Sequence, residues 1–274
     1  MNGRALVWAW MLAMLPLCAM AARQEVLLND GWAGVMTPEN GEVRRLDAIS
    51  LPHNWDDYHG YRQHFHGSLH GSAVYMRTFE VSKAAGERCF LVFKGAGSYL
   101  SVEVNDRPVV THLAAGRCVQ AVEVTKVVKR GTNELKVVCE HPSDIRDMPW
   151  VCGGCDICGC ESPEPFGLFR DVLLVTTGAA RLVPYGLHVW PDAACEKAFV
   201  EAEVDVGVLP PGDLRLRISR PALGIDETVS CADAKDGLIH REYPIRGVRR
   251  WSVEEPNLYD FKAALTDASG AVLD

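Results

Sequence analysis

The amino-acid sequence predicts an all-β protein built from two successive domains, a jelly-roll sandwich followed by an immunoglobulin-like sandwich. Short runs of alternating apolar and polar residues recur along the chain, and no helical period is sustained. The connectors between these runs are rich in Gly, Asn and Asp, the residues of tight turns. The length of 274 residues is enough for two domains that each bury a core.

Residues 1–21 are predicted to be a secretory signal peptide. Arg4 gives a cationic start, an apolar run from Ala5 to Cys18 follows, and Ala19-Met20-Ala21 has the small-x-small form of a cleavage site. A membrane anchor is the alternative, but the run is shorter than the roughly 20 apolar residues that a spanning helix needs. We therefore expect an exported protein, periplasmic or extracellular, with no membrane partner after cleavage.

The first domain is expected over residues 25–178. Its strands are predicted at 73–81, 89–94, 99–104, 119–124, 134–140 and 172–176. Gly95-Ala96-Gly97 and Asn105-Asp106 are typical turns between strands, because Gly, Asn and Asp tolerate positive φ more readily than other residues. The small residues Gly178-Ala179-Ala180 then indicate a boundary.

The second domain is expected over residues 181–274, with strands at 186–190, 199–208, 214–219, 227–231, 238–243 and 258–266. About seven short strands in roughly a hundred residues is typical of an immunoglobulin-like sandwich. The last residues, Ala271 to Asp274, are expected to begin a further strand that is cut short. An open edge of that kind suggests a truncated chain.

Charge and isolated cysteines limit the classes of partner. The formal net charge is −8 and Lys and Arg are scattered, so the sequence predicts no nucleic-acid partner. Five isolated cysteines are expected mainly as small buried hydrophobic residues, with disulfides in an oxidising compartment as the alternative: Cys89, Cys118, Cys139, Cys195 and Cys231.

A dense cysteine cluster, Cys152-x-x-Cys155-x-x-Cys158-x-Cys160, is the strongest competing signal. Thiolates in a Gly-rich loop suit zinc or an iron–sulfur cluster. Exported proteins seldom carry iron–sulfur centres, so local disulfides are favoured first, free thiols second and a metal third. The histidines His59, His64, His66 and His70 show no regular ligand spacing and are interpreted as a solvated loop. We therefore expect no cofactor.

Three motifs in order carry a family resemblance. They are Leu51-Pro52-His53-Asn54-Trp55, Pro165-Phe166-Gly167-Leu168-Phe169-Arg170-Asp171-Val172 and Trp251-Ser252-Val253-Glu254-Glu255-Pro256-Asn257-Leu258-Tyr259. Together they resemble the accessory half of glycoside hydrolase family 2, from about Leu28 to the end of the chain. The resemblance implies that the first domain is a galactose-binding-like, sugar-binding sandwich and that the partner is a carbohydrate.

The same resemblance implies the site residues. Asp171 matches the family's Asp that accepts hydrogen bonds from sugar hydroxyls, a role that suits a carboxylate. Arg170 precedes it, and a structural Arg170–Asp171 ion pair is the alternative interpretation. His53 and Asn54 are weaker candidates for substrate contact, and Trp55 is expected to be buried.

The sequence departs from the family pattern at two positions, and one adjacent pair of glutamates is not interpreted as catalytic. Asp106 stands where the family usually has Gly, and 112–116 differs from the Gly-Gly-aromatic run of relatives, so sugar contact from that loop is in doubt. The adjacent Glu254 and Glu255 are interpreted as a turn that caps the second sandwich. Adjacent residues rarely converge on one pocket as the acid and nucleophile of a glycosidase must.

The resemblance therefore implies the non-catalytic N-terminal portion of an exported retaining glycosidase. Its substrate is a β-galactoside or a related β-glycoside, and its catalytic acid and nucleophile lie on a barrel outside this sequence. The chain alone is expected to be inactive, and whether the complete enzyme forms a homo-oligomer stays open. The alternative is a stand-alone carbohydrate-binding protein, which predicts exposed aromatic residues grouped on one side of the first sandwich.

Overall fold

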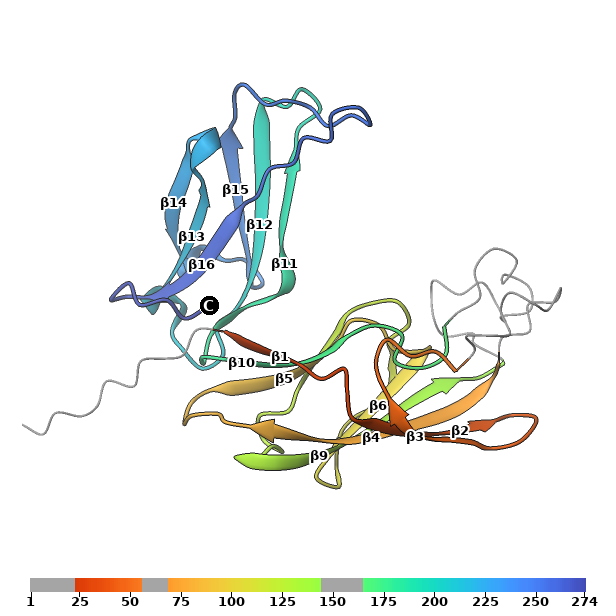
Figure 1. Ribbon diagram of the computed structural model, residues 1–274. Helices are drawn as coiled ribbons and strands as arrows, with labels where there is room; N and C mark the ends of the chain where they lie inside the picture. Colours follow the sequence, from red (N-terminus) through yellow and green to blue (C-terminus); the bar gives the residue numbers. More distant parts are fainter. Residues whose placement is uncertain (1–22, 56–68, 144–164) are drawn as a thin grey trace, which may run out of the picture.

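The fold is all-β, as the sequence predicted. The computed structural model describes residues 23–55, 69–143 and 165–274, and within them every strand pairing is antiparallel. Two β-sandwich domains follow one another along the chain, and the second stands over one sheet of the first (Figure 1). Three short 3-10 helices, Pro211–Asp213, Pro221–Leu223 and Cys231–Asp233, lie in connectors of the second domain.

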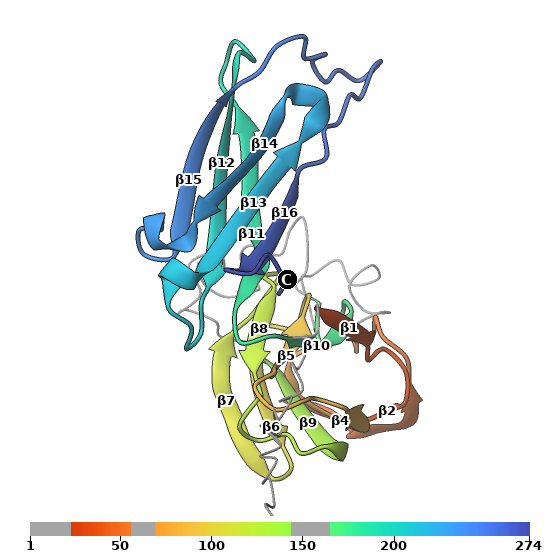
Figure 2. The same cartoon turned by 90° about the vertical axis from the view of Figure 1, so that its left-hand side faces the viewer.

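The first domain packs a six-stranded sheet against a four-stranded sheet, as the two layers of Figure 2 show. The larger sheet has the order β3 (Arg44–Ile49), β2 (Trp32–Pro38), β4 (Gly71–Val81), β9 (Gly131–His141), β6 (Tyr99–Val104) and β7 (Arg107–Ala114). The smaller sheet has the order β1 (Gln24–Leu27), β10 (Val172–Thr177), β5 (Arg88–Phe93) and β8 (Gln120–Glu123).

Large aromatic side chains fill the core between these two sheets. Alternation along β4 turns Ala73, Tyr75, Phe79 and Val81 inward, since successive side chains of a strand point to opposite faces. Fully buried aromatic residues from other elements meet them, namely Trp32, Phe93 and Phe166. The core therefore connects the loop that carries Phe166 rigidly to the body of the domain.

The second domain contains two three-stranded sheets in its described residues. One has the order β11 (Arg181–Pro191), β12 (Lys197–Asp205) and β15 (Leu238–Pro244), and the other β14 (Ile225–Ser230), β13 (Leu214–Arg220) and β16 (Lys262–Asp267). Its core is aliphatic, with Leu216, Ile218, Ile239 and Leu265 fully buried. Six strands are formed here rather than the seven or so expected, and 258–261 is an irregular segment before β16.

The last residues do not form the open edge that the sequence predicted. Val272 makes an isolated antiparallel bridge to Thr266, and the amide of Leu273 donates to the carbonyl of Leu265 at 2.7 Å. Leu273 is buried in the second core. A tight turn at 268–270 reverses the chain, so that residues 271–274 pair with β16 itself and the side chain of Leu273 is buried.

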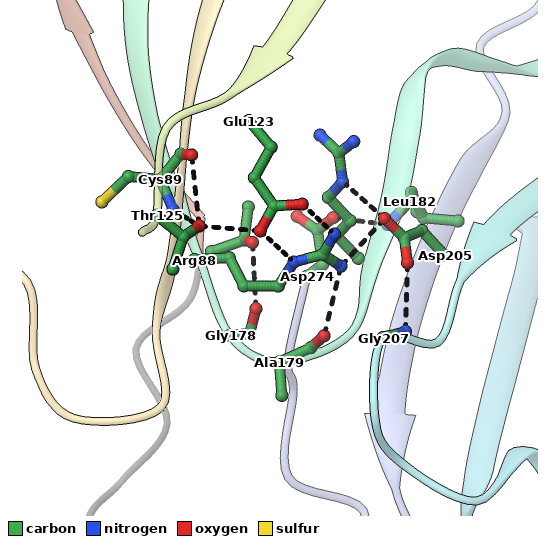
Figure 3. A network of polar contacts seen from close by, with 12 residues as sticks. Arg88, Cys89, Glu123, Thr125, Gly178, Ala179, Leu182, Asp205, Gly207 and Asp274 are labelled. Atoms are coloured by element: carbon green, nitrogen blue, oxygen red, sulfur yellow. Dashed lines mark hydrogen bonds and ion pairs between the residues drawn. The ribbon is translucent and has the colours of Figure 1, made fainter. Parts of the chain in front are cut away.

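A network of charged residues joins the two domains (Figure 3). Arg88 on β5 pairs with Glu123 of its own domain at 2.8 Å and with Asp205 of the second domain, also at 2.8 Å. Arg181, at the start of β11, lies with its guanidinium carbon 3.5 Å from the centre of the Phe90 ring and donates to Asp205 at 3.3 Å. The outer face of the four-stranded sheet is thus the docking face for the second domain.

A second ion pair closes the same junction. Arg23 donates to both carboxylate oxygens of Asp274, at 2.8 and 2.7 Å, and to the carbonyl of Leu182 at 2.6 Å. The amide of Leu182 in turn donates to Asp274 at 2.7 Å. The bidentate geometry fixes both orientation and distance. The start of the described chain is therefore tied to its last residue.

The described cysteines are free thiols. Cys89, Cys139 and Cys231 are buried, as expected for small hydrophobic residues, whereas Cys195 is half-buried and Cys118 exposed. The 152–160 cluster and the 1–21 segment lie outside the described residues. In the part of the chain that the structure describes, no helix has the length and hydropathy to cross a membrane.

Candidate functional site

Two of the three sequence motifs meet at one edge of the first domain. The amide of His53 donates to the carbonyl of Leu168 at 2.8 Å, and the amide of Trp55 donates to the carbonyl of Phe166, also at 2.8 Å. The segments 51–55 and 165–171 therefore run side by side, joined by backbone hydrogen bonds, although more than a hundred residues separate them in sequence. The site is a rigid loop platform rather than a pair of independent loops.

Glycines permit this close approach. Gly167 has φ +132°, and a Cβ added there would meet the hydroxyl of Tyr75 and, at 2.9 Å, the carbonyl oxygen of His53. Gly97 donates to the carbonyl of Gly167 at 2.7 Å, and a Cβ on Gly97 would meet the amide nitrogen of Gly167 at 2.8 Å. Only glycine fits both the conformation and the space at position 167.

Asp171 follows this platform immediately before β10. Its Oδ1 accepts a hydrogen bond from the side-chain amide of Asn29 at 2.9 Å, and its Oδ2 pairs with the ammonium of Lys94 at 3.0 Å. The hydrogen bond from Asn29 and then that from Lys94 hold the pKa of Asp171 below its usual range, because both favour the charged form. Asp171 is an oriented carboxylate anion at neutral pH.

Asn29 and Lys94 were not identified from the sequence. Asn29 also accepts the amide of Val172 at 3.2 Å through its side chain and the amide of Leu51 at 2.8 Å through its carbonyl, so it connects both motif segments. Lys94 directly follows β5, and its backbone amide donates to the carbonyl of Asp171 at 3.0 Å. No local pattern marks either residue, since their role depends on contacts 142 and 77 residues away.

The Asp171 carboxylate retains capacity to bind a ligand. A carboxylate has about four lone-pair positions, and the two described side-chain partners use two of them. About a third of the side chain, 35%, is exposed. An anion with a lowered pKa is a poor general acid at neutral pH but a strong acceptor for hydroxyl groups. The geometry therefore suits ligand orientation rather than proton donation.

Arg170 precedes Asp171 in sequence and is exposed. Within the described residues, the side-chain partners of Asp171 are Asn29 and Lys94, so the structural Arg170–Asp171 ion pair considered above is replaced by a Lys94–Asp171 pair.

His53 and Asn54 have clear positioning contacts. The Nδ1 atom of His53 lies 2.9 Å from the hydroxyl of Tyr75, and its ring meets the Trp55 ring edge-on at 4.9 Å. The side-chain oxygen of Asn54 accepts the amide of Phe166 at 2.9 Å. Trp55 is buried, as predicted. Burial raises the pKa of Tyr75 far above its ordinary value, so its hydroxyl stays neutral and anchors the platform.

The histidines of the following loop separate into two groups. His59, His64 and His66 lie outside the described residues, whereas the ring of His70 stacks on buried His141 at 5.1 Å. The Nδ1 atom of His141 lies 2.7 Å from the hydroxyl oxygen of Ser98. Burial lowers the pKa of His141 to about 4, so its imidazole is neutral. In the described part of the chain, no group of three or more His, Cys, Asp or Glu could hold a metal ion.

Other motif residues are structural. Asn105 and Asp106 both have positive φ, 52° and 58°, as the sequence predicted for this tight turn, and the side chain of Asn105 donates to Asn133 at 2.8 Å. Glu254 and Glu255 lie exposed in the irregular segment before β16, where Glu255 pairs with Arg249 at 2.7 Å. The segment before β16 lies at the end of the second domain that faces away from the first domain (Figure 1).

Comparisons with known proteins support one family. Residues 186–274 match the family model described as glycosyl hydrolases family 2. The resemblance to this family is thereby confirmed. Among curated proteins, a "Putative beta-glucuronidase" of Formosa agariphila is 24% identical over 237 residues, and a beta-galactosidase of Alteromonas mediterranea is 22% identical over 301 residues.

Solved structures show the same fold over most of the chain. An FMN-binding beta-glucuronidase from Facaelibacterium prausnitzii superposes with a TM-score of 0.69 at 23% identity, covering 93% of this chain and 38% of that one. A Bacteroides uniformis beta-glucuronidase gives 0.67 at 19% identity, covering 92% and 31%. The two curated relatives are matched over 83% and 93% of this chain but only 27% of their own length.

Proposed function

We propose that this chain is the substrate-positioning, N-terminal portion of an exported glycoside hydrolase that acts on β-galactosides or related β-glycosides with retention of configuration. The similarity to family 2 glycosidases over more than four fifths of the chain supports the carbohydrate class. The similarity supports a β-glucuronide as a substrate equally well, since one relative is named a beta-glucuronidase and the other a beta-galactosidase. The exposed Arg170, next to Asp171 in sequence, would suit the carboxylate of such a sugar.

The observation that carries the proposal is the state of Asp171. Two independent partners hold the carboxylate ionised and oriented, and lone pairs remain for a ligand. Charge-assisted hydrogen bonds to sugar hydroxyls would fix the ring relative to a catalytic acid and nucleophile supplied by another part of the enzyme. The chain would then contribute binding energy and orientation, and no bond-breaking step.

The fixed platform explains why the contact needs a whole domain. His53 and Asn54 hold segment 51–55 against segment 165–171, and Gly167 lets the two approach. Positioning errors of about 1 Å can reduce a rate a hundredfold, so a ligand-contacting carboxylate benefits from a rigid support. In this proposal His53 acts through the loop geometry, and Asp171 touches the sugar.

The proposal is tested by comparing two proteins on 4-nitrophenyl β-galactoside and β-glucuronide. One is the 274-residue chain, and the other is the product of the same gene with all sequence downstream of the Asp274 codon. We expect turnover only from the second. Turnover by the 274-residue chain, or a stop codon directly after Asp274 in the genomic DNA, would contradict the proposal.

The alternative of a stand-alone binding protein based on the first sandwich receives less support. Sugar-binding faces need accessible rings, and the large aromatic residues of the first domain are buried in its described part, with Phe169 half-buried. Among the residues that the structure describes, the exposed aromatic side chains lie in the second domain instead.

A further inference from the structure

The second domain carries an aromatic surface that the Asp171 site does not use. On the outer face of the β11–β12–β15 sheet, the rings of His188, Trp190 and Phe199 stack in sequence. The ring centres of His188 and Trp190 are 4.5 Å apart and those of Trp190 and Phe199 are 5.6 Å apart, with interplanar angles of 27° and 26°. Trp190 and Phe199 are directly opposite each other on paired strands. Strand geometry therefore holds these rings in a nearly parallel row.

Two hollows meet at Trp190. The larger, about 500 Å³, is also lined by Trp251 and Tyr259 from the segment before β16 and by Asn257. The smaller, about 260 Å³, is lined by Phe199, Glu201 and His240. Both hollows are comparable to or smaller than ordinary small-molecule sites. We call the two hollows with the Trp190 ring between them the Trp190 groove.

Exposure of the rings distinguishes this groove from ordinary core packing. Trp251 is 60% exposed, and Trp190 and Tyr259 are half-buried. Leaving a large ring in water forgoes the roughly 2 kcal/mol or more that its burial contributes. A ring of this kind next to a hollow offers a flat apolar platform for a ligand.

Most polar groups around the groove have partners among the described residues. Arg250, which also lines the larger hollow, donates to the backbone carbonyls of Ala193 and Ala194 at 3.2 and 3.0 Å. Glu201 lies 3.0 Å from Nδ1 of His240, Glu242 pairs with Lys197 at 2.5 Å, and Arg249 pairs with Glu255 at 2.7 Å. Charges that balance one another give no net attraction for an anion or a cation. Carboxylates and imidazoles in such pairs still exchange hydrogen bonds with hydroxyl groups.

We propose that the Trp190 groove is a second carbohydrate site, which binds a neutral oligosaccharide chain remote from Asp171. The apolar C–H face of a sugar ring would lie on the exposed Trp251 ring, the neighbouring sugar would contact the part of Trp190 that the His188 and Phe199 rings leave accessible, and their hydroxyls would bond to Glu201, His240 and Asn257. Around the groove the carboxylates Glu201, Glu242 and Glu255 are equalled in number by the cations Lys197, Arg249 and Arg250, so we expect a neutral chain to bind in preference to a uronic-acid polymer. The ligand class rests on the proposed function, but the groove is independent of Asp171 and would hold the enzyme on a polymeric substrate.

The test is affinity electrophoresis of the 274-residue chain through native gels that contain β-1,4-galactan, xylan, hydroxyethylcellulose or polygalacturonate. We expect at least one neutral polymer to retard the chain. Trp190→Ala and Trp251→Ala should each weaken that retardation about tenfold or more, the loss of roughly 1.4 kcal/mol of stacking. Trp251 is exposed, so its variant should fold normally even if Trp190→Ala does not.

Two matched controls separate this inference from its alternatives. Tyr185→Ala removes another aromatic residue, 73% exposed, that lies outside the groove, and it should keep the retardation. Asp171→Asn should keep it as well, so a failure of the proposed catalytic role would leave this result unchanged. Loss of the retardation in either control would overturn the inference.

Further outcomes would also overturn it. These are no retardation by any neutral polymer, retardation by polygalacturonate alone, or full retardation of both tryptophan variants. Sedimentation velocity provides the last check. If the chain dimerises in a concentration-dependent way and Trp251→Ala abolishes the dimer, the surface is a protein interface and the carbohydrate assignment is wrong.

Discussion

The two sandwiches place their aromatic residues in opposite ways. The first buries Trp32, Tyr75, Phe93 and Phe166 between its sheets, whereas the buried core of the second is aliphatic and its described rings are half-buried or exposed. Both cores satisfy the same requirement for buried apolar area. In the first domain the aromatic rings therefore stabilise the core that supports the Asp171 platform. In the second domain the half-buried and exposed rings can contact a ligand.

The largest expected effect comes from removing a core ring. Phe93→Ala should lower the free energy of unfolding of the first domain by about 3–5 kcal/mol, because it loses buried area and leaves a cavity. Trp251→Ala, which removes an exposed ring, should change the stability of the second domain by less than about 1 kcal/mol. Urea unfolding followed by near-UV circular dichroism measures both, and equal losses would break the comparison.

The stability of the first domain should also fall with acid. His141 has its pKa lowered to about 4 by burial, while an unfolded histidine titrates near 6.5. The stabilisation is therefore present above about pH 6.5 and is lost as pH falls toward 4. The loss between pH 7 and pH 5 should be about 2 kcal/mol.

A variant isolates this contribution from that of the carboxylates. His141→Gln has no imidazole to protonate, so its unfolding free energy should change less than that of the wild type over the same pH range. Parallel pH profiles of the two proteins would show that His141 does not carry the acid sensitivity.

Gly167→Ala tests the close approach of the two motif segments. The added Cβ would be strained at φ +132° and would meet Tyr75 and the His53 carbonyl, so we expect a loss of about 2 kcal/mol or more. Gly131→Ala is the matched control, because Gly131 has φ +91° but nothing within 4 Å of the added atom. In urea unfolding, Gly131→Ala should lower the free energy of unfolding by only about 1 kcal/mol. Equal losses for the two variants would mean that backbone strain alone, and not the close approach at Gly167, causes the effect.

The smallest expected effect concerns the junction. Arg88→Gln removes the Arg88–Asp205 pair, which is mostly shielded from solvent, together with the Arg88–Glu123 pair, and should reduce stability by about 1–2 kcal/mol. Arg217→Gln breaks the exposed Arg217–Asp226 pair of the second domain and should cost at most about 0.5 kcal/mol. The two variants are compared by their unfolding temperatures at low and high salt. Similar decreases in unfolding temperature for both would mean that the junction ion pair contributes no more than an exposed surface pair.

The strands that could not be predicted from the sequence are mainly exposed strands at the sheet edges. Central strands such as β4 and β9 alternate strongly because one face is buried, and their positions were predicted. Missed strands β1 and β3 are sheet edges and are largely exposed, so their alternation is weak. The edge strands β7 and β8 were indicated, β7 by the turn at Asn105-Asp106 and β8 by the predicted strand 119–124. Central β2 was also missed, and its pattern is interrupted by Gly34, where a Cβ would meet the side chains of Ile49 and Trp55.

The candidate site was predictable only in part. The family motif indicated Asp171, and the role proposed for it stays a prediction. Its partners Asn29 and Lys94 could not be found because long-range strand pairing brings them together. The Trp190 groove was missed for the same reason, since its rings come from paired strands and from the segment at 251–259.

The most direct test of the central claim is the kinetics of Asp171→Asn in the protein expressed with its downstream sequence. We expect kcat/KM for the preferred aryl β-glycoside to fall about tenfold to a hundredfold, the loss of a charged hydrogen bond to substrate. Asp226→Asn, which changes a carboxylate of an exposed ion pair in the second domain, should leave it unchanged. Equal activity of Asp171→Asn and wild type would contradict the account.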